Sequence, residues 1–205
     1  MIEYVISGGP VMIPIGLASV VALAVFLERL WSLRRARVLP HALLMEVMEQ
    51  LRQGRHDDAL VRCRSADVAV ARVLEQALIC RDKPRERVRE RLEEIGRREA
   101  AELERYIPVL GTIASISPLL GLLGTVGGMI LTFQIIQEQG LGNVGNLAGG
   151  ISQALVTTFA GLSVGIPAVV GNRYLLAKVD ALLLDLEEAS LGALDLLYGE
   201  QREEP

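Results

Sequence analysis

The charged residues of the chain are distributed so that three long apolar segments remain. Residues 4–27, 106–137 and 139–172 contain no Asp, Glu, Lys or Arg. Each segment is longer than the roughly 20 residues that an α-helix needs to cross a hydrocarbon core about 30 Å thick. The pattern therefore predicts three transmembrane helices and an all-α membrane protein.

Between the first and second apolar segments, hydrophobic residues recur at helical spacing in two shorter stretches. Residues 43–51 carry the first pattern and residues 68–78 the second, and Gly54 ends the first. Asp57 and Ser65 are residue types that cap helix N-termini, which predicts that a second and a third short helix start there. These stretches predict a small cluster of helices outside the membrane.

Two further segments are predicted to extend the membrane helices. Residues 85–105 place apolar residues on one face and pair Glu with Arg four residues later. No obvious breaker precedes the second apolar segment, so one helix is predicted to run through both, with kinks at Pro108 and Pro118. Residues 176–205 mix leucines with acidic residues and predict a helix that continues from the third apolar segment.

The basic residues predict the orientation of the chain. Of the 21 Lys and Arg residues, 17 lie in residues 34–105, and the same segment contains 14 Asp and Glu residues. Basic residues accumulate in the cytoplasmic segments of membrane proteins, so this segment and the C-terminus are predicted to be cytoplasmic. The predicted segments are a short external N-terminus (1–9), a first span (10–32), a cytoplasmic helical region (33–105), a second span (106–137), an external loop (138–149), a third span (150–175) and a cytoplasmic C-terminal helix (176–205).

Composition supports a membrane protein and argues against several other classes. The chain is 51% hydrophobic, with a mean hydropathy of +0.36. Its first apolar segment precedes the first basic residue, an order typical of a retained anchor and not of a cleaved signal peptide. The nearly balanced charge of residues 34–105 offers no nucleic-acid-binding face. Cys63 and Cys80 have no neighbouring Cys or His pair, so we expect inert thiols and no bound metal.

Small residues in the second and third spans predict close helix packing. Gly124 and Gly128 form a GxxxG pair, and Gly161 and Gly165 form another. In membranes such pairs let two helix backbones approach closely. We therefore assign these four glycines to helix packing.

The same two spans carry informative hydroxyl and amide side chains, namely Thr112, Ser115, Ser117, Thr125 and Thr132 in the second and Ser152, Gln153, Thr157, Thr158 and Ser163 in the third. A membrane threonine often only bonds a carbonyl of its own helix, and this reading stays open for each threonine taken alone. Between Tyr106 and Asn172 the one ionisable side chain is Glu138, in the loop. Hydroxyls and amides do not take up and release protons near neutral pH, so proton conduction would require a carboxylate from a partner.

No motif of an enzyme accompanies these residues. The sequence lacks a Walker lysine, an HExxH pair and a GxSxG turn, so no catalytic residue and no cofactor are assigned.

Two motifs resemble a known family. They are SPLLGLLGTVGGM at residues 117–129, and GISQALVTTFAGL at 150–162 followed by GIPAVVGNR at 165–173. With the three-span plan and the insert after the first span, they resemble the MotA/TolQ/ExbB proton-channel family, closest to its ExbB and TolQ branch. The resemblance implies a homopentamer with long cytoplasmic helical extensions. The pentamer surrounds the membrane helices of a dimer of a single-span protein similar to ExbD or TolR, whose membrane Asp carries the ion.

The resemblance also implies roles for single residues. Thr125 and Thr158 match the threonines that line the path facing the partner's Asp, and Thr157 and Gln153 are counted with them. Family members commonly have Glu where this chain has Gln153, so a ring of acids at that level is missing. The pair Thr157 and Thr158 also suits coordination of Na⁺, so the translocated ion is H⁺ with Na⁺ left open.

The function implied is that of a channel and stator subunit in a motor driven by the proton motive force. Its location would be the bacterial inner membrane, with a periplasmic N-terminus, a cytoplasmic C-terminus and contacts to membrane lipids but not to nucleic acid. Energising a TonB-like protein is the expected process, and a Tol-Pal or gliding motor is the alternative within the family. An alternative of another class is a membrane-anchored scaffold or signalling protein whose glycine faces serve dimerisation only.

Overall fold

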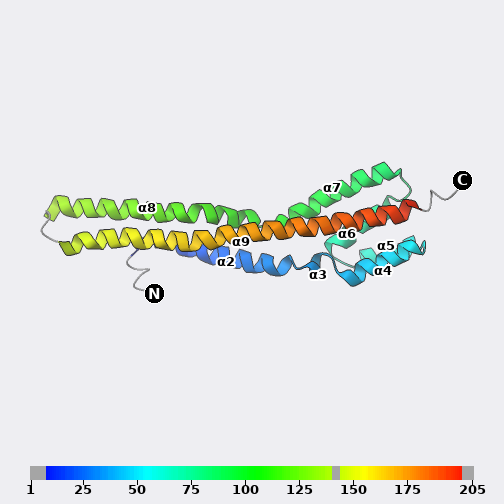
Figure 1. Cartoon of the computed structure of the whole chain (residues 1–205), viewed down its shortest axis with the longest axis horizontal. Coiled ribbons are helices and arrows are strands. Elements are labelled where there is room, and N and C mark those ends of the chain that lie inside the picture. The colour runs from blue at the N-terminus through cyan, green and yellow to red at the C-terminus, as the bar shows by residue number, and fades with distance from the viewer. Residues whose placement is uncertain (1–7, 140–143, 200–205) are drawn as a thin grey trace. The chain divides into compact units, whose positions relative to one another are not determined.

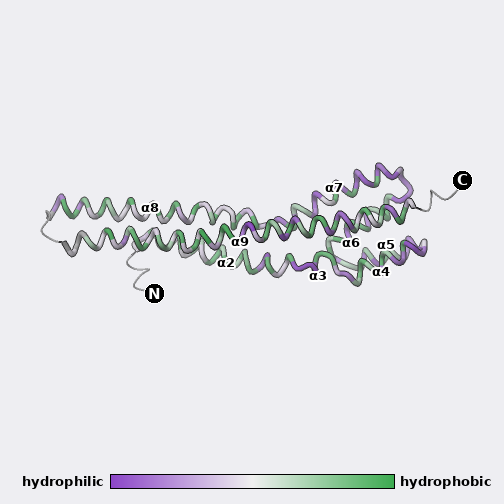
Figure 2. Tube along the Cα trace, in the orientation of Figure 1, coloured by the Kyte–Doolittle hydropathy of each residue, from purple (hydrophilic) through white to green (hydrophobic). Residues whose placement is uncertain are grey.

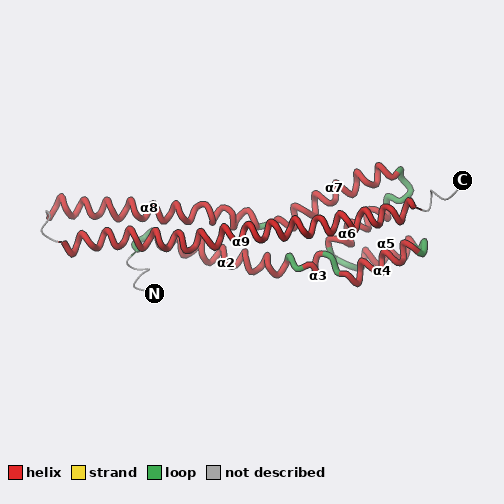
Figure 3. The backbone as a smooth tube through the Cα atoms, in the orientation of Figure 1, coloured by secondary structure: helices red, strands yellow, loops and turns green. Residues whose placement is uncertain are grey.

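The computed structural model describes residues 8–139 and 144–199, and every regular element in those ranges is a helix (Figure 3). Helices α2, α8 and α9 are long and apolar enough to cross a membrane, and Figure 2 shows the hydropathy along each trace. The chain is therefore an all-α membrane protein, as the sequence predicts. The helices are α2 (Met12–Ser32), α3 (Arg35–Val38), α4 (His41–Arg52), α5 (His56–Arg64), α6 (Ala69–Ile79), α7 (Arg85–Glu104), α8 (Ile107–Gln139) and α9 (Val144–Gly199) (Figure 1).

The described residues fall into two compact units. The first combines the residues up to Arg29 with Tyr106–Leu175, and so contains most of α2, all of α8 and the first part of α9. The second combines Leu30–Arg105 with the residues from Leu176 onward, and so contains α3 to α7 and the second part of α9. We refer to them as the hairpin unit and the polar unit.

The helix predicted to run from residue 85 through the second span is interrupted. Helix α7 ends at Glu104 and α8 begins at Ile107, and between them Tyr106 adopts a φ of 67° that non-glycine residues rarely adopt. Pro108 explains the break, because it has no N–H to donate to the Glu104 carbonyl, yet it is well tolerated in the first turn of a new helix. The prediction of a kinked continuous helix is therefore wrong at this proline.

Arg29 packs against this interruption within the hairpin unit. Its side chain is only 7% exposed, and its guanidinium carbon lies 5.4 Å from the centroid of the Tyr106 ring. An arginine at this distance from an aromatic ring is attracted by the negative face of the ring. Nη2 of Arg29 also donates to Oε1 of Glu28 at 2.7 Å. The contact with the ring therefore ties Arg29 of α2 to the residue that precedes α8.

The connection between α8 and α9 is shorter than the predicted loop 138–149. Helix α8 reaches Gln139 and α9 begins at Val144, and residues 140–143 lie outside the described part of the chain. Gly128 and Thr132 of α8 still contact Gly150 near the start of α9. Packing against α8 therefore stabilises the glycine-rich start of α9 as a helix, although the intrinsic helix propensity of glycine is low.

In the hairpin unit, α2 runs alongside α9 in the same direction (Figure 1). Gly9, just before α2, lies against the side chain of Gln153. Near the other end of α2, a methyl group at Gly171 would lie 3.0 Å from the Phe26 ring. The glycine therefore lets the two helices approach each other there.

The polar unit is built around an apolar core. The turn between α4 and α5 is a Schellman motif, since Arg55 N–H donates to the Gln50 carbonyl at 2.9 Å and Gly54 N–H to that of Leu51 at 3.0 Å. Gly54 has a φ of 68°, which only glycine adopts without strain. One cluster of the core joins α6, α7 and α9 through Val73, Ala77, Cys80, Val88, Leu92 and Leu194.

The predicted N-caps Asp57 and Ser65 are wrong. Helix α5 begins at His56 after Arg55, so Asp57 lies in its first turn, where its charge complements the helix dipole. Ser65 follows the last residue of α5, and its hydroxyl donates to the Arg62 carbonyl at 2.7 Å. A serine can satisfy carbonyls at a helix end as well as N–H groups at a helix start, so the residue type alone did not fix its position.

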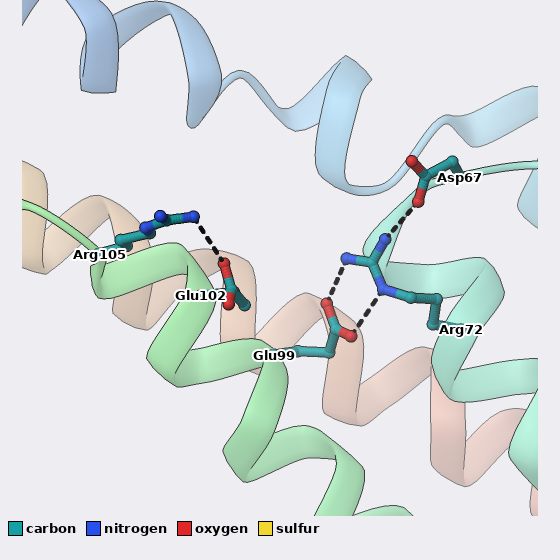
Figure 4. Close-up of polar contacts among 5 residues, drawn as sticks. All are labelled: Asp67, Arg72, Glu99, Glu102 and Arg105. Carbon is teal, nitrogen blue, oxygen red and sulfur yellow. Dashed lines mark hydrogen bonds and ion pairs between the residues drawn. The ribbon is translucent and has the colours of Figure 1, made fainter.

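A partly buried ion pair joins α6 to α7 (Figure 4). Nε and Nη2 of Arg72 donate to the two carboxylate oxygens of Glu99 at 2.8 and 2.6 Å, and Glu99 is only 7% exposed. Nη1 of Arg72 donates to Asp67 at 2.8 Å. The hydrogen bonds to Glu99 raise the pKa of Arg72, so Arg72 stays charged at any physiological pH.

Cys63 and Tyr198 have perturbed acidities in the polar unit. Burial, together with the nearby charge of Glu75, raises the pKa of the Cys63 thiol to about 11. Burial also raises the pKa of Tyr198, whose hydroxyl lies 2.5 Å from the Lys83 carbonyl oxygen and 3.1 Å from that of Arg81. Cys63 is therefore almost entirely the unreactive thiol at neutral pH.

Candidate functional site

Helices α8 and α9 form an antiparallel hairpin in which glycines of both helices meet. A methyl group at Gly161 would lie 2.5 Å from the Ser117 carbonyl oxygen, and one at Gly128 would lie 2.7 Å from that of Gly150. The two backbones are therefore closer than most side chains would allow. The ordered contacts are Gly111 with Asn172, Pro118 with Gly165, Gly121 with Gly161, Gly124 with Thr157, and Gly128 with Ala154 and Gly150.

Pro118 creates a local irregularity at the centre of this contact. It lies inside α8, where it removes the N–H that would bond the Ala114 carbonyl. A methyl group at Gly165 would lie 2.8 Å from both Cγ and Cδ of the proline ring. Ser117 is fully buried, and its hydroxyl has no hydrogen-bond partner among the described residues. This part of the hairpin therefore combines a close contact with a buried hydroxyl that has no partner among the described residues.

The two adjacent threonines of α9 have different environments. Thr157 is fully buried, packs against Gly124, and places its hydroxyl 2.9 Å from the Ala154 carbonyl oxygen. Thr158 is only partly buried, and its hydroxyl donates across the hairpin to the Gly121 carbonyl at 3.2 Å. Thr157 thus lies inside the helix contact, whereas Thr158 lies at its edge.

Thr125 of α8 lies at the same level as Thr158. Gly124 and Thr157 contact each other across the hairpin, and Thr125 follows Gly124 as Thr158 follows Thr157. Like Thr158, Thr125 is only partly buried. Its hydroxyl donates to the Leu122 carbonyl of its own helix at 2.6 Å. In an antiparallel pair of right-handed helices, residues that follow the contact by one position lie on the same side of the pair. The structure therefore brings Thr125 and Thr158 together on one face.

Gln153 lies on another face of α9. It is five residues before Thr158, which corresponds to about 140° around the helix axis. Its amide lies against Gly9, which precedes α2. Gln153 is therefore covered by the N-terminal part of the hairpin unit, while the face of Thr125 and Thr158 is bordered by exposed apolar residues, namely Leu122, Met129, Leu155 and Leu162.

The chemistry of the threonine face is that of hydrogen-bond acceptors. Both hydroxyl protons are directed at backbone carbonyls, so the oxygens of Thr125 and Thr158 retain lone pairs that can accept from water or contact a cation. Among residues 107–172 the one ionisable side chain is Glu138, near the end of α8. The described part of the chain contains no group of three or more His, Cys, Asp or Glu that could hold a metal ion.

The fold defines a helical membrane protein in which Thr125 and Thr158 place hydroxyls on one face of the hairpin. A family model described as the MotA/TolQ/ExbB proton channel family matches residues 64–188. The chain belongs to this family, and the resemblance predicted from the sequence is confirmed.

Individual relatives support the ExbB and TolQ branch. Over the whole chain, 31% of residues are identical to the biopolymer transport protein ExbB-like 1 of Synechocystis sp., of which the alignment covers 82%. ExbB of Aquifex aeolicus is 43% identical over 42% of the chain and 58% of its own length. TolQ of the Tol-Pal system of Haemophilus influenzae is 39% identical over 43% of the chain and 39% of its own length. The chain is thus a proton-channel subunit of ExbB and TolQ type.

Sequence reasoning missed Asn172 and Gly121 in the hairpin, and it counted Ser117 only among the hydroxyls of the second span. The Asn172 amide donates to the Ile107 carbonyl at 3.1 Å and thereby ties α9 to the first turn of α8. Gly121 faces Gly161, and Ser117 carries the buried hydroxyl. A signal was available for Asn172, because an amide just before Arg173 at the end of an apolar span needs a polar partner. Nothing in the sequence distinguishes Gly121 from the other glycines of its motif.

Proposed function

We propose that this protein is the channel and stator subunit of an ion-driven motor in the bacterial inner membrane. In this proposal a homopentamer encloses two membrane helices of a single-span partner similar to ExbD or TolR. The partner supplies the Asp that takes up and releases the ion, and the polar unit, which includes the second part of α9, lies in the cytoplasm. The work is delivered to a TonB-like protein or to a related process of the envelope.

The observation that carries the proposal is the shared level and face of Thr125 and Thr158. A carboxylate facing them would meet two hydroxyl oxygens whose protons are already bonded to carbonyls. Such oxygens favour a water, a hydronium or a Na⁺ ion over an anion. Five copies of this pair would form a ring of polar contacts in an otherwise apolar bore. Thr157 packs behind this ring inside the hairpin, and Gln153 adds a polar side chain on another face of α9.

Replacement of Thr158 by Val tests the role of the hydroxyl. Valine keeps the shape of the side chain, so the hairpin should assemble, while ion flux should fall about tenfold or more because a stabilising polar step of the path is lost. The measurement is ion uptake by proteoliposomes that contain the complex with its partner. Thr158→Ser should restore most of the flux. Thr112→Val removes a hydroxyl that donates to the Pro108 carbonyl of its own helix α8, and this control should not reduce the flux.

Equal flux in the Thr158→Val variant and in the unaltered protein would refute the role of this face. The same assay identifies the ion when it is run in the absence of Na⁺. A proton path then acidifies the interior of the proteoliposomes, which a pH-sensitive dye reports, whereas a Na⁺ path gives no acidification.

The assembly is tested by native mass spectrometry after purification in mild detergent with and without a co-expressed single-span partner. A complex with five copies of this chain and two of the partner would support the motor. A monomer or dimer that ignores every such partner would instead support a membrane-anchored scaffold.

A further inference from the structure

A cluster of arginines follows directly after helix α2. Arg34, Arg35 and Arg37 occupy or precede the short helix α3, and all three are exposed. Between Arg29 and Glu46 the chain contains no acidic residue, so the local charge is strongly positive. Figure 2 shows the change from the apolar α2 to the hydrophilic α3.

The orientation of the cluster is fixed by burial of its neighbours. Leu33, Val38 and Leu39 are 0%, 4% and 6% exposed, so the apolar side chains of this turn point inward. The arginines between them are therefore directed outward. Arg35 pairs with Asp185 at 2.9 Å, whereas among the described residues no carboxylate lies within ion-pair distance of Arg34 or Arg37.

Trp31 marks the level of the cluster in the membrane. It is 53% exposed and continues, at helical spacing, the exposed apolar stripe of Leu27 and Leu23 on α2. Tryptophans at the ends of membrane helices lie at the level of the lipid headgroups. The guanidinium carbon of Arg37 lies 3.4 Å from the centroid of the Trp31 ring, so Arg37 is stacked on it and held at the same level.

We propose that Trp31, Arg34 and Arg37 form a binding site for the headgroup of an anionic phospholipid. Two guanidinium groups without a protein carboxylate can donate to the oxygens of one phosphodiester, and Trp31 can pack beside the glycerol and the first methylenes of the chains. A zwitterionic lipid presents the same phosphate beside a positive amine, so the site should select lipids with net negative charge. The site would fix the depth and rotation of the first span, independently of any partner protein.

The chain offers an intrinsic reporter, because Trp31 is its one tryptophan. The full-length protein is reconstituted in bilayers in which either phosphatidylglycerol or phosphatidylcholine carries brominated chains, which quench tryptophan fluorescence on contact. In the unaltered protein at low salt, brominated phosphatidylglycerol should quench Trp31 at a much lower mole fraction than brominated phosphatidylcholine. Raising the ionic strength should reduce this preference, since the contacts are at the surface.

The double variant Arg34→Gln/Arg37→Gln should lose the preference, with a fall in relative affinity of roughly 30-fold. The matched control Arg87→Gln/Arg89→Gln removes the same charge from α7, where each arginine already pairs with a glutamate, and should keep the preference. Arg34→Lys/Arg37→Lys should keep most of it. These two variants separate loss of the site from loss of net charge or of insertion.

Three results would overturn the proposal. They are equal quenching by the two brominated lipids in the unaltered protein, an unchanged preference in the Arg34→Gln/Arg37→Gln variant, and relief of quenching by soluble glycerol phosphate added at the concentration of the lipid. The last would indicate a site for free phosphate and not for a membrane lipid.

Discussion

The two units of this protein are stabilised by different means. In the hairpin unit, glycines bring the backbones of α8 and α9 together, and large side chains such as Leu119, Leu155 and Phe159 remain exposed. In the polar unit, leucines and valines fill a core, and ion pairs such as Arg72 with Glu99 lie at its edge. Glycines thus make the contact between α8 and α9, beside a few large buried residues such as Ile107 and Leu110, whereas the polar unit has no such line of glycine contacts among its described residues.

The difference follows from the surroundings of each region. Lipid solvates a leucine as well as a protein core does, so burying large apolar residues stabilises a membrane helix pair little, and close packing of small residues must supply the contact. In water the opposite holds, and each buried apolar side chain contributes about 1.5–3 kcal/mol. A glycine at the helix contact therefore stabilises the hairpin, whereas a glycine in the interior of a helix weakens the polar unit.

The largest expected effect of a single methyl group is at Gly161. Gly161→Ala would place a Cβ 2.5 Å from the Ser117 carbonyl oxygen and 2.9 Å from Cα of Gly121, so the backbones must separate. We expect the free energy of unfolding to fall by about 3 kcal/mol or more, although alanine has the higher helix propensity. Thermal unfolding in detergent, followed by circular dichroism, measures this loss.

Gly127→Ala is the matched control on the same hairpin, because a methyl group there has nothing within 4 Å. Its unfolding temperature should stay equal or rise slightly. If both variants unfold like the unaltered protein, close backbone contact does not stabilise the hairpin.

This contrast also explains which features could be predicted from the sequence. Long charge-free segments predict membrane helices because the length needed to cross a bilayer is fixed, and the two motifs predicted the family. The difference between Thr157 and Thr158 could not be predicted, since adjacent residues of one type are separated only by how α9 packs on α8. The break at Tyr106 was missed because Pro108 was expected to bend a helix and not to start one.

The next effect in size concerns the polar unit. Glu99→Gln keeps the shape of the side chain but removes the charge that accepts two hydrogen bonds from Arg72 (Figure 4). The Arg72 side chain is 44% exposed and keeps its bond to Asp67. We therefore expect the free energy of unfolding to fall by about 2 kcal/mol, near the lower end of what hydrogen bonds to charged groups contribute. In a protein of this size the unfolding temperature should fall by about 4–8 °C.

Glu94→Gln provides the control for this prediction. Glu94 also bonds two arginines, Arg91 and Arg98, each at 2.6 Å, and these bonds lower its pKa. Since this carboxylate is exposed to water, its removal should leave the unfolding temperature nearly unchanged. If Glu99→Gln and Glu94→Gln lowered the unfolding temperature equally, burial of Glu99 would not add to the stability that its ion pair with Arg72 contributes.

The smallest expected effect has the opposite sign to the first. Gly96 lies in the middle of α7, where a methyl group meets nothing within 4 Å and would project into a groove of about 430 Å³ between α7 and α9. Gly96→Ala should raise the stability by about 0.5–1 kcal/mol, because alanine loses less conformational freedom than glycine on forming a helix. The same chemical change would then destabilise the hairpin at Gly161 and stabilise the polar unit at Gly96. A loss of stability in Gly96→Ala would show that α7 also depends on close approach at its glycine, and the distinction between the two units would not extend to that helix.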